Sequence, residues 1–86
     1  TTEQRRAYCG RYRLGDLTYV VECETAGLTG GMPGRPRKAL RLESPDVFFV
    51  PGEPRTRRIF QRDAAGRLTG FLERRESWDL PWKRAD

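Results

Sequence analysis

Turn signals recur along the chain at intervals of roughly 8–12 residues, and this spacing limits the fold more than any other feature. Each signal contains Gly, Pro, Asp or Ser, the residues that favour tight turns. The intervening segments are too short for stable helices and are rich in aromatic and branched side chains, which suit a half-buried sheet. The turns are Gly15-Asp16, Thr25-Ala26-Gly27, Met32-Pro33-Gly34, Ser44-Pro45-Asp46, Pro51-Gly52-Glu53-Pro54 and Asp63-Ala64-Ala65-Gly66.

The regular spacing of these turns predicts an all-β fold with eight strands. Because every connection is short, the strands form an up-and-down antiparallel meander, and closing it into a small barrel removes the unpaired edges. An open half-barrel around a helix is the alternative. At 86 residues the chain is expected to be one domain, residues 1–86. The strands are expected at Gly10–Leu14, Leu17–Glu24, Leu28–Met32, Arg35–Glu43, Val47–Val50, Thr56–Arg62, Leu68–Arg74 and Ser77–Arg84, after a helical turn over Thr2–Tyr8.

Alternation along the strands assigns side chains to the two faces of the sheet. Gly70 lies inside a predicted strand, where glycine often marks a bulge or a bend that helps a sheet to close. Pro81 cannot donate to a ladder, so its strand is an edge or has a bulge there. The clearest inward-facing sets are Leu40 with Leu42, and Trp78 with Leu80 and Trp82.

The sequence offers little for catalysis. Histidine is absent, which excludes a Ser-His-Asp or Cys-His nucleophile system within the chain. The two serines, Ser44 and Ser77, are not followed by a lysine three residues later. Carboxylate pairs such as Glu73 and Glu76 are expected at exposed positions, and the glycine-rich segment after Gly27 lacks the phosphate-binding P-loop pattern. We expect no enzymatic activity, no catalytic residue and no cofactor.

Cys9 and Cys23 are the only cysteines. Two thiols without a histidine cannot form a four-ligand zinc site, so no structural metal is expected. A disulfide requires the strands that carry the two cysteines to pair with them opposite each other. Since free cysteine is among the most often buried residues, the prediction is two free buried thiols, with the disulfide as the alternative.

The chain carries a formal net charge of +5, and all its basic residues except Lys38 and Lys83 are arginine. A solvated outer face is the simplest interpretation of this charge. The alternative is a basic barrel that binds nucleic acid or another anionic ligand, because arginines beside aromatic rings suit single-stranded nucleic acid. The candidate contact surface for that role is Arg55, Arg57, Arg58, Arg62, Trp78 and Trp82.

No stretch of the sequence is long and apolar enough to span a membrane, and the chain as given has no signal-peptide pattern, so we expect a soluble protein. The compartment and the oligomeric state stay open. The chain begins with Thr-Thr-Glu rather than methionine. Three origins are consistent with this start: a processed product, a trimmed chain or a domain excised from a longer polypeptide.

The order of several motifs resembles a known module. The motifs are a Tyr-x-Gly-x-Tyr opening (Tyr8, Gly10, Tyr12), a leucine and a Pro-Gly turn (Leu28, Pro33, Gly34), an aspartate-then-phenylalanine strand (Asp46, Phe48) and the hairpin Phe60, Arg62, Asp63, Gly66, Gly70, Phe71. Together they resemble the lipocalin-like C-terminal domain appended to serine β-lactamase-like hydrolases, the relatives of penicillin-binding proteins, esterases and D-aminopeptidases. The resemblance covers nearly the whole chain.

The resemblance implies a non-catalytic accessory barrel that packs beside a serine hydrolase domain, in the same or another chain, and shapes substrate access or domain association. Arg58 departs from the pattern because an apolar residue is expected there. The C-terminal segment also contains more tryptophan than the usual ending of this module. The Ser-x-x-Lys motif of the hydrolases is absent, so no catalytic residue is carried over. A small apolar ligand in the lumen is a third alternative, although eight short strands leave an interior that their own side chains nearly fill.

Overall fold

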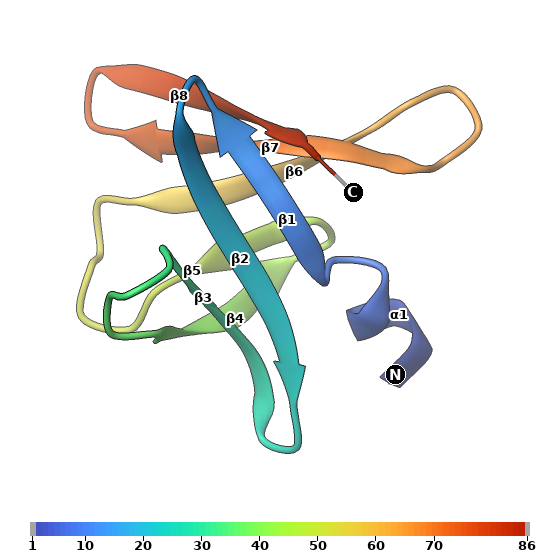
Figure 1. The fold of residues 1–86 in the computed structure, drawn as a ribbon, viewed down its shortest axis with the longest axis horizontal. Coiled ribbons are helices and arrows are strands. Elements are labelled where there is room, and N and C mark those ends of the chain that lie inside the picture. Colours follow the sequence, from blue (N-terminus) through green and yellow to red (C-terminus); the bar gives the residue numbers. More distant parts are fainter. Residues whose placement is uncertain (1, 86) are drawn as a thin grey trace.

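The computed structural model describes residues 2–85, which form a closed antiparallel β-barrel with a short helix at one end (Figure 1). Consecutive strands pair throughout, and β8 pairs with β1 to complete the ring. The predicted up-and-down barrel is therefore confirmed, and the open half-barrel is wrong. The elements are α1 Thr2–Arg6, β1 Gly10–Leu14, β2 Leu17–Glu24, β3 Gly27–Gly31, β4 Lys38–Ser44, β5 Val47–Phe49, β6 Arg57–Arg62, β7 Leu68–Arg75 and β8 Trp78–Arg84.

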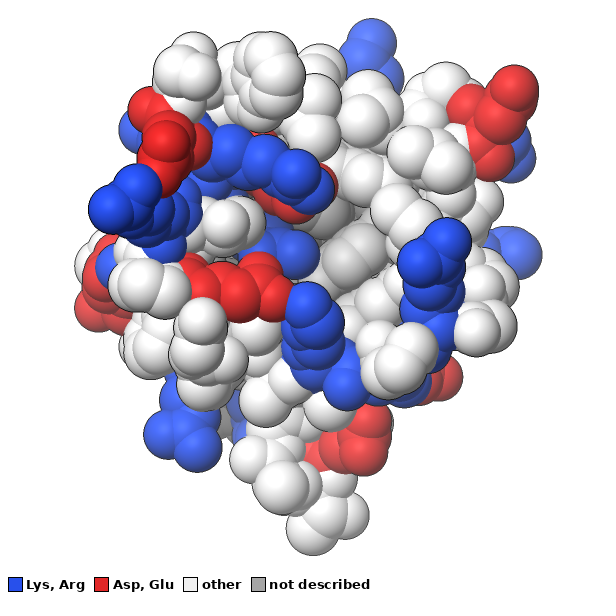
Figure 2. All heavy atoms as spheres, turned by 90° about the vertical axis from the view of Figure 1, so that its left-hand side faces the viewer, with Lys and Arg blue, Asp and Glu red and all other residues white. Residues whose placement is uncertain are grey.

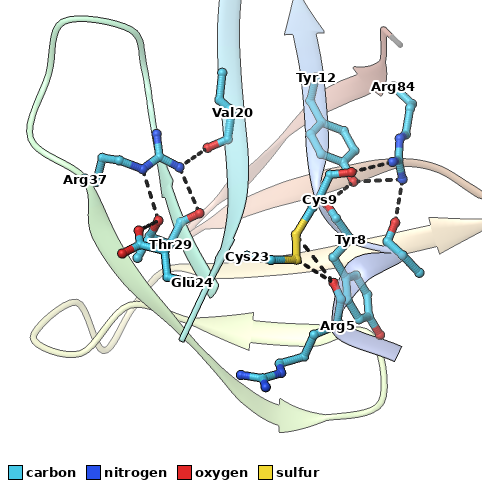
Figure 3. Close-up of a disulfide and its surroundings, with 11 residues drawn as sticks. Arg5, Tyr8, Cys9, Tyr12, Val20, Cys23, Glu24, Thr29, Arg37 and Arg84 are labelled. Atoms are coloured by element: carbon cyan, nitrogen blue, oxygen red, sulfur yellow. Dashed lines mark hydrogen bonds between the residues drawn. A yellow bond between two sulfur atoms is a disulfide. The ribbon is translucent and has the colours of Figure 1, made fainter. Parts of the chain in front are cut away.

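The largest difference from the predicted boundaries lies at the start of β4, which begins at Lys38 rather than at Arg35. Pro33 and Pro36 lack a backbone N–H and cannot extend the ladder. The Arg37 side chain supplies hydrogen bonds to the backbone in place of a longer strand. Its Nη2 donates to the carbonyl oxygens of Val20 at 2.7 Å and Thr29 at 3.0 Å (Figure 3). The connection between β3 and β4 is consequently a loop held by one guanidinium.

Aromatic rings fill the middle of the barrel. Tyr12 and Phe71 are completely buried, with ring centroids 5.1 Å apart in an edge-to-face arrangement. Phe71 also stacks on Trp82 at 5.9 Å, with an angle of 11° between the rings. Such contacts add to the free energy gained by burying the rings. The interior is packed by the barrel's own side chains, as expected for eight short strands.

Two glycines allow this packing. A Cβ atom at Gly70 would overlap the backbone carbonyl oxygen of Trp82, and a Cβ at Gly30 would overlap the Tyr19 ring. Beside Gly70 the register between β6 and β7 shifts, because Gln61 pairs with Gly70 and Arg62 pairs with Leu68. The bulge or bend expected at Gly70 is therefore confirmed as a register shift next to this residue, where the backbone must approach the next strand closely.

Two residues predicted to be buried lie at the rims instead. Leu42 pairs with Phe48 and faces the same side as the core, but it is 60% exposed because the barrel ends there. Trp78 is 66% exposed for the same reason, whereas Trp82, on the same face of β8, is buried. Pro81 pairs with Leu72 of β7 without a register shift, and β8 also pairs with β1, so the prediction of an edge or a bulge at Pro81 is wrong.

Cys9 and Cys23 form a disulfide with a Cα–Cα distance of 6.0 Å, so the prediction of free buried thiols is wrong (Figure 3). Gly10 pairs with Val21, so this register brings Cys9 and Cys23 close together, one position away from being directly opposite. Both sulfur atoms lie 3.6 Å from the carbonyl oxygen of Arg5 in α1. The disulfide therefore joins the segment that carries the helix to the end of β2.

Candidate functional site

Open space in this barrel lies at its two ends, since aromatic rings occupy the middle. One end carries α1, the β2–β3 and β4–β5 turns and the β6–β7 loop, and the other carries the β1–β2, β3–β4, β5–β6 and β7–β8 connections (Figure 1). Alternating connections of a meander must fall at opposite ends, so the strand order itself places the two groups of loops.

A cleft of about 890 Å³ lies at the helix end, and we call it the helix-side cleft. The walls come from α1, the start of β3, the middle of β4 and the β4–β5 turn. Leu42 is its exposed apolar group, whereas Leu28, Leu40 and Phe48 at its base belong to the core. Its apolar lining residues are Ala7, Ala26, Leu28, Leu40, Leu42 and Phe48.

A polar network closes one side of the helix-side cleft. Tyr8 donates a hydrogen bond from its hydroxyl to Asp46 Oδ1 at 2.7 Å. Arg62 binds the same carboxylate through two nitrogen atoms of its guanidinium, with Nε donating to Oδ2 at 2.9 Å and Nη2 to Oδ1 at 3.0 Å. Arg62 Nη1 also donates to the carbonyl oxygen of Gly66 at 2.8 Å. Bidentate geometry of this kind makes the guanidinium–carboxylate pair strong and specific.

The network shifts the acidity of its members. The Arg62 guanidinium, followed by the Tyr8 hydroxyl, lowers the pKa of Asp46 below its ordinary value, and burial only partly opposes this. Burial and the hydrogen bond to Asp46 raise the pKa of Tyr8. The Asp46 carboxylate raises the pKa of Arg62. All three groups therefore keep their ordinary neutral-pH forms and serve a structural role.

The helix-side cleft also carries positive charge without a matching carboxylate. Among residues 2–85, the guanidinium groups of Arg5 and Arg41 have no ion-pair partner, and both line the cleft. An apolar wall beside uncompensated guanidinium groups suits a ligand or protein segment that combines an apolar side chain with a carboxylate.

A second cavity of about 670 Å³ opens at the opposite end, and we call it the Arg58 cavity. Figure 2 views this end of the barrel, where acidic and basic side chains alternate around a hollow. Glu73 lies in its wall with only 7% of its surface exposed, and accepts hydrogen bonds from Trp82 Nε1 at 3.1 Å and Arg75 Nη2 at 2.8 Å. Its lining residues are Lys38, Glu53, Pro54, Arg55, Thr56, Arg58, Glu73, Arg75 and Glu76.

The four arginines of the predicted contact surface lie in different parts of the barrel. Arg55 pairs with Glu76 in the loops of the Arg58 cavity. Arg57 points outward, where it binds Glu43 at 3.1 Å. Arg62 lies at the opposite end of the barrel, in the Asp46 network. Arg58 faces inward from β6, and its side chain is only 9% exposed.

The two tryptophans of that surface do not form a stacking pair. Trp78 is an exposed group at the rim, and Trp82 is part of the core. Trp82 stacks on Phe71 inside the barrel, so its ring faces are not available to a base. The predicted six residues therefore do not share one face, although Arg55 and Arg58 do line the same cavity.

Sequence reasoning missed Tyr8, Asp46 and Glu73 as partners in buried or half-buried networks. Tyr8 and Asp46 are 38 residues apart, and only barrel closure brings them together. Glu73 was expected at an exposed position, and that expectation is wrong. The available signal was its spacing from Phe71, which puts both side chains on the inward face of one strand.

The chain matches no family model, no curated protein and no solved structure. The resemblance to the hydrolase-appended domain therefore stays a prediction. Within residues 2–85, α1 does not have the length or apolar character of a membrane-spanning helix. The same part of the chain contains no cluster of three or more His, Cys, Asp or Glu side chains arranged to hold a metal ion.

Proposed function

We propose that this chain is a non-catalytic accessory barrel that docks on a neighbouring protein domain through the helix-side cleft. The partner surface presents an apolar side chain flanked by carboxylates. The partner class implied by the sequence resemblance is a serine β-lactamase-like hydrolase domain, in the same chain or another. In that position the barrel would shape access to the hydrolase site or hold the domains together.

The observation that carries this proposal is Leu42. A leucine that is 60% exposed beside a cleft of about 890 Å³ presents apolar area that a partner can remove from water. Arg41 lies next to it in β4 without an ion-pair partner in the described part of the chain, so a partner carboxylate can reach it. The packed interior also favours recognition at the rim over storage of a ligand in the lumen.

The competing proposal is a basic barrel that binds nucleic acid or another anionic ligand. The net charge of +5 favours it. Against it, Arg55, Arg57 and Arg62 are each paired with a carboxylate and do not lie on one face. The two proposals differ in salt dependence, because binding to nucleic acid weakens steeply as salt rises, whereas apolar docking does not.

Photocrosslinking from position 42 tests the docking role. Leu42 is replaced with the photoreactive residue p-benzoylphenylalanine in the native polypeptide, and the adducts formed in the source cells are identified by mass spectrometry. Trp78, an exposed apolar residue at the opposite end, is replaced in the same way as the matched control. We expect adducts from position 42 alone, at peptides of a domain that carries a Ser-x-x-Lys motif.

A Leu42→Asp variant supplies the second readout. It should weaken co-purification of that domain by about tenfold or more, since it removes an apolar contact and introduces a charge opposed to the partner's carboxylates. Trp78→Asp should leave co-purification unchanged. Equal adducts from both positions, or binding to single-stranded oligonucleotides that falls steeply with salt and ignores Leu42→Asp, would show that the docking role is wrong.

A further inference from the structure

The cavity at the end opposite α1 contains a buried cation, Arg58, two of whose nitrogen atoms have no hydrogen-bond acceptor. The side chain of Arg58 is 9% exposed, and among residues 2–85 its Nε and Nη1 are the buried side-chain nitrogen atoms that lack a hydrogen-bond acceptor. The closest carboxylate oxygen is Glu53 Oε1, 3.9 Å from Nη1, which is too far for a hydrogen bond. A buried guanidinium in this state is costly unless an acceptor reaches it.

The neighbouring carboxylates are already held by other cations. Glu53 is bound by Lys38 and Glu76 is bound by Arg55. Glu73 is held by Arg75 and by the indole N–H of Trp82. Each of these carboxylates therefore already has a cationic partner, and the Tyr19 hydroxyl beside Arg58 leaves Nε and Nη1 of the guanidinium without an acceptor.

The charge balance of the cavity points to the same group. Its lining contains the four cations Lys38, Arg55, Arg58 and Arg75 and the three carboxylates Glu53, Glu73 and Glu76. The lining therefore carries an excess of one positive charge, and Arg58 is the cation whose closest carboxylate oxygen lies beyond hydrogen-bond distance. A single negative charge would balance the cavity, whereas a dianion such as hydrogen phosphate would leave it with a net negative charge.

The surroundings of Arg58 fix the position of its guanidinium. The Cζ atom lies 5.7 Å from the centroid of the Tyr19 ring, and the side chain extends from the inward face of β6 to the cavity. Tyr19 itself is held in place because Gly30 leaves room for its ring. The planar fork of arginine matches the two oxygens of a carboxylate, and its rigid support makes it a preformed recognition group.

We infer that the Arg58 cavity binds the carboxylate group of a small monoanionic ligand through the Arg58 guanidinium. The cavity volume of about 670 Å³ accommodates a small organic acid at the open end of the barrel. This site lies at the opposite end from the helix-side cleft, so it is independent of the docking proposed above.

A titration followed by two-dimensional amide NMR tests the site. The probes are N-acetylglycine and N-acetylglycinamide, which have nearly the same shape but differ in charge, at constant pH and ionic strength. We expect saturable shifts at the β6 amides near Arg58 with N-acetylglycine and none with N-acetylglycinamide. Equal binding of the two probes, or tighter binding of inorganic phosphate than of N-acetylglycine, would overturn the inference.

Matched variants locate the binding group. Arg58→Met should weaken N-acetylglycine binding about tenfold or more, because a charge-assisted hydrogen bond is lost. Arg57→Met, the adjacent outward-facing residue, should leave the affinity unchanged. Retained binding in Arg58→Met would exclude this guanidinium as the recognition group.

A second pair of variants does not depend on removing Arg58. Glu53→Gln takes away the carboxylate 3.9 Å from Arg58 and should tighten N-acetylglycine binding about threefold. Glu76→Gln, which removes a charge from the same cavity but from the side of Arg55, should have a smaller effect. If both variants had the same effect, general electrostatic attraction to the cavity would replace a specific site at Arg58.

Discussion

Asp46 shows how one residue can join segments that are far apart in the chain. It occupies the β4–β5 turn with φ at 65°, a left-handed conformation that aspartate and asparagine tolerate better than most residues. From there its carboxylate binds Tyr8, which follows α1, and Arg62 at the end of β6. The same side chain thus supports the turn and one wall of the helix-side cleft.

Replacing Asp46 should change how stability depends on pH. The pKa of its carboxyl is lowered in the folded state, so its contribution is present above the unfolded value of 3.8 and is lost as pH falls below it. Asp46→Asn keeps the turn conformation and removes the charge. We expect a less stable protein at pH 7 and a flatter decline in unfolding free energy between pH 5 and pH 2, measured by urea denaturation.

The control for this change is Asp16→Asn, in the exposed β1–β2 turn, where no ion pair is formed with the rest of residues 2–85. This variant should keep the slope of the original protein over the same pH range. Identical slopes for Asp46→Asn and the original protein would mean that the Arg62 pair contributes nothing to the acid sensitivity.

At the scale of elements, α1 depends on the disulfide for its position. The helix has five residues, too few to be stable alone. The Cys9–Cys23 bond ties the chain directly after it to β2, and both sulfur atoms contact the helix at Arg5 (Figure 3). The wall that α1 contributes to the helix-side cleft therefore depends on a covalent bond.

Reduction of the disulfide should destabilise the fold. The bond closes a loop of sequence separation 14, and a loop of about 15 residues corresponds to about 3 kcal/mol in the chain-entropy model. We expect a lower urea midpoint after treatment with reductant, with complete reduction verified by thiol titration. The variant Cys9→Ala with Cys23→Ala should show the lower midpoint already and should not respond to reductant. An unchanged midpoint after full reduction would contradict this role.

For the whole molecule, closure depends on the seam between the first and last strands. Two residue pairs, Tyr12 with Arg84 and Arg13 with Lys83, define this register. The Arg84 guanidinium adds hydrogen bonds across the seam to the carbonyl oxygens of Ala7 at 2.7 Å and Cys9 at 2.6 Å. The Arg84 side chain thus links the last strand to the start of the chain, next to the disulfide (Figure 3).

Arg84→Met should lower the free energy of unfolding by about 1–3 kcal/mol, because its charge-assisted hydrogen bonds to Ala7, Cys9 and the Tyr12 hydroxyl are lost and the apolar part of the side chain is kept. Lys83→Met, on the exposed outward face of the same strand, is the matched control and should change stability little. Amide exchange of β1 residues at the seam should accelerate in Arg84→Met alone. Equal destabilisation by the two variants would indicate a general effect of lost charge.

The turn residues and the alternation of side chains determined the strand order and the barrel class, because turn geometry and face preference are local properties. The bulge at Gly70 followed from the same local reasoning. Tertiary structure decided what local patterns do not contain: how far each strand extends past the rim, which made Leu42 and Trp78 exposed, and the register that joined Cys9 to Cys23. It also left Nε and Nη1 of Arg58 buried without an acceptor, since burial and pairing depend on contacts between strands distant in sequence.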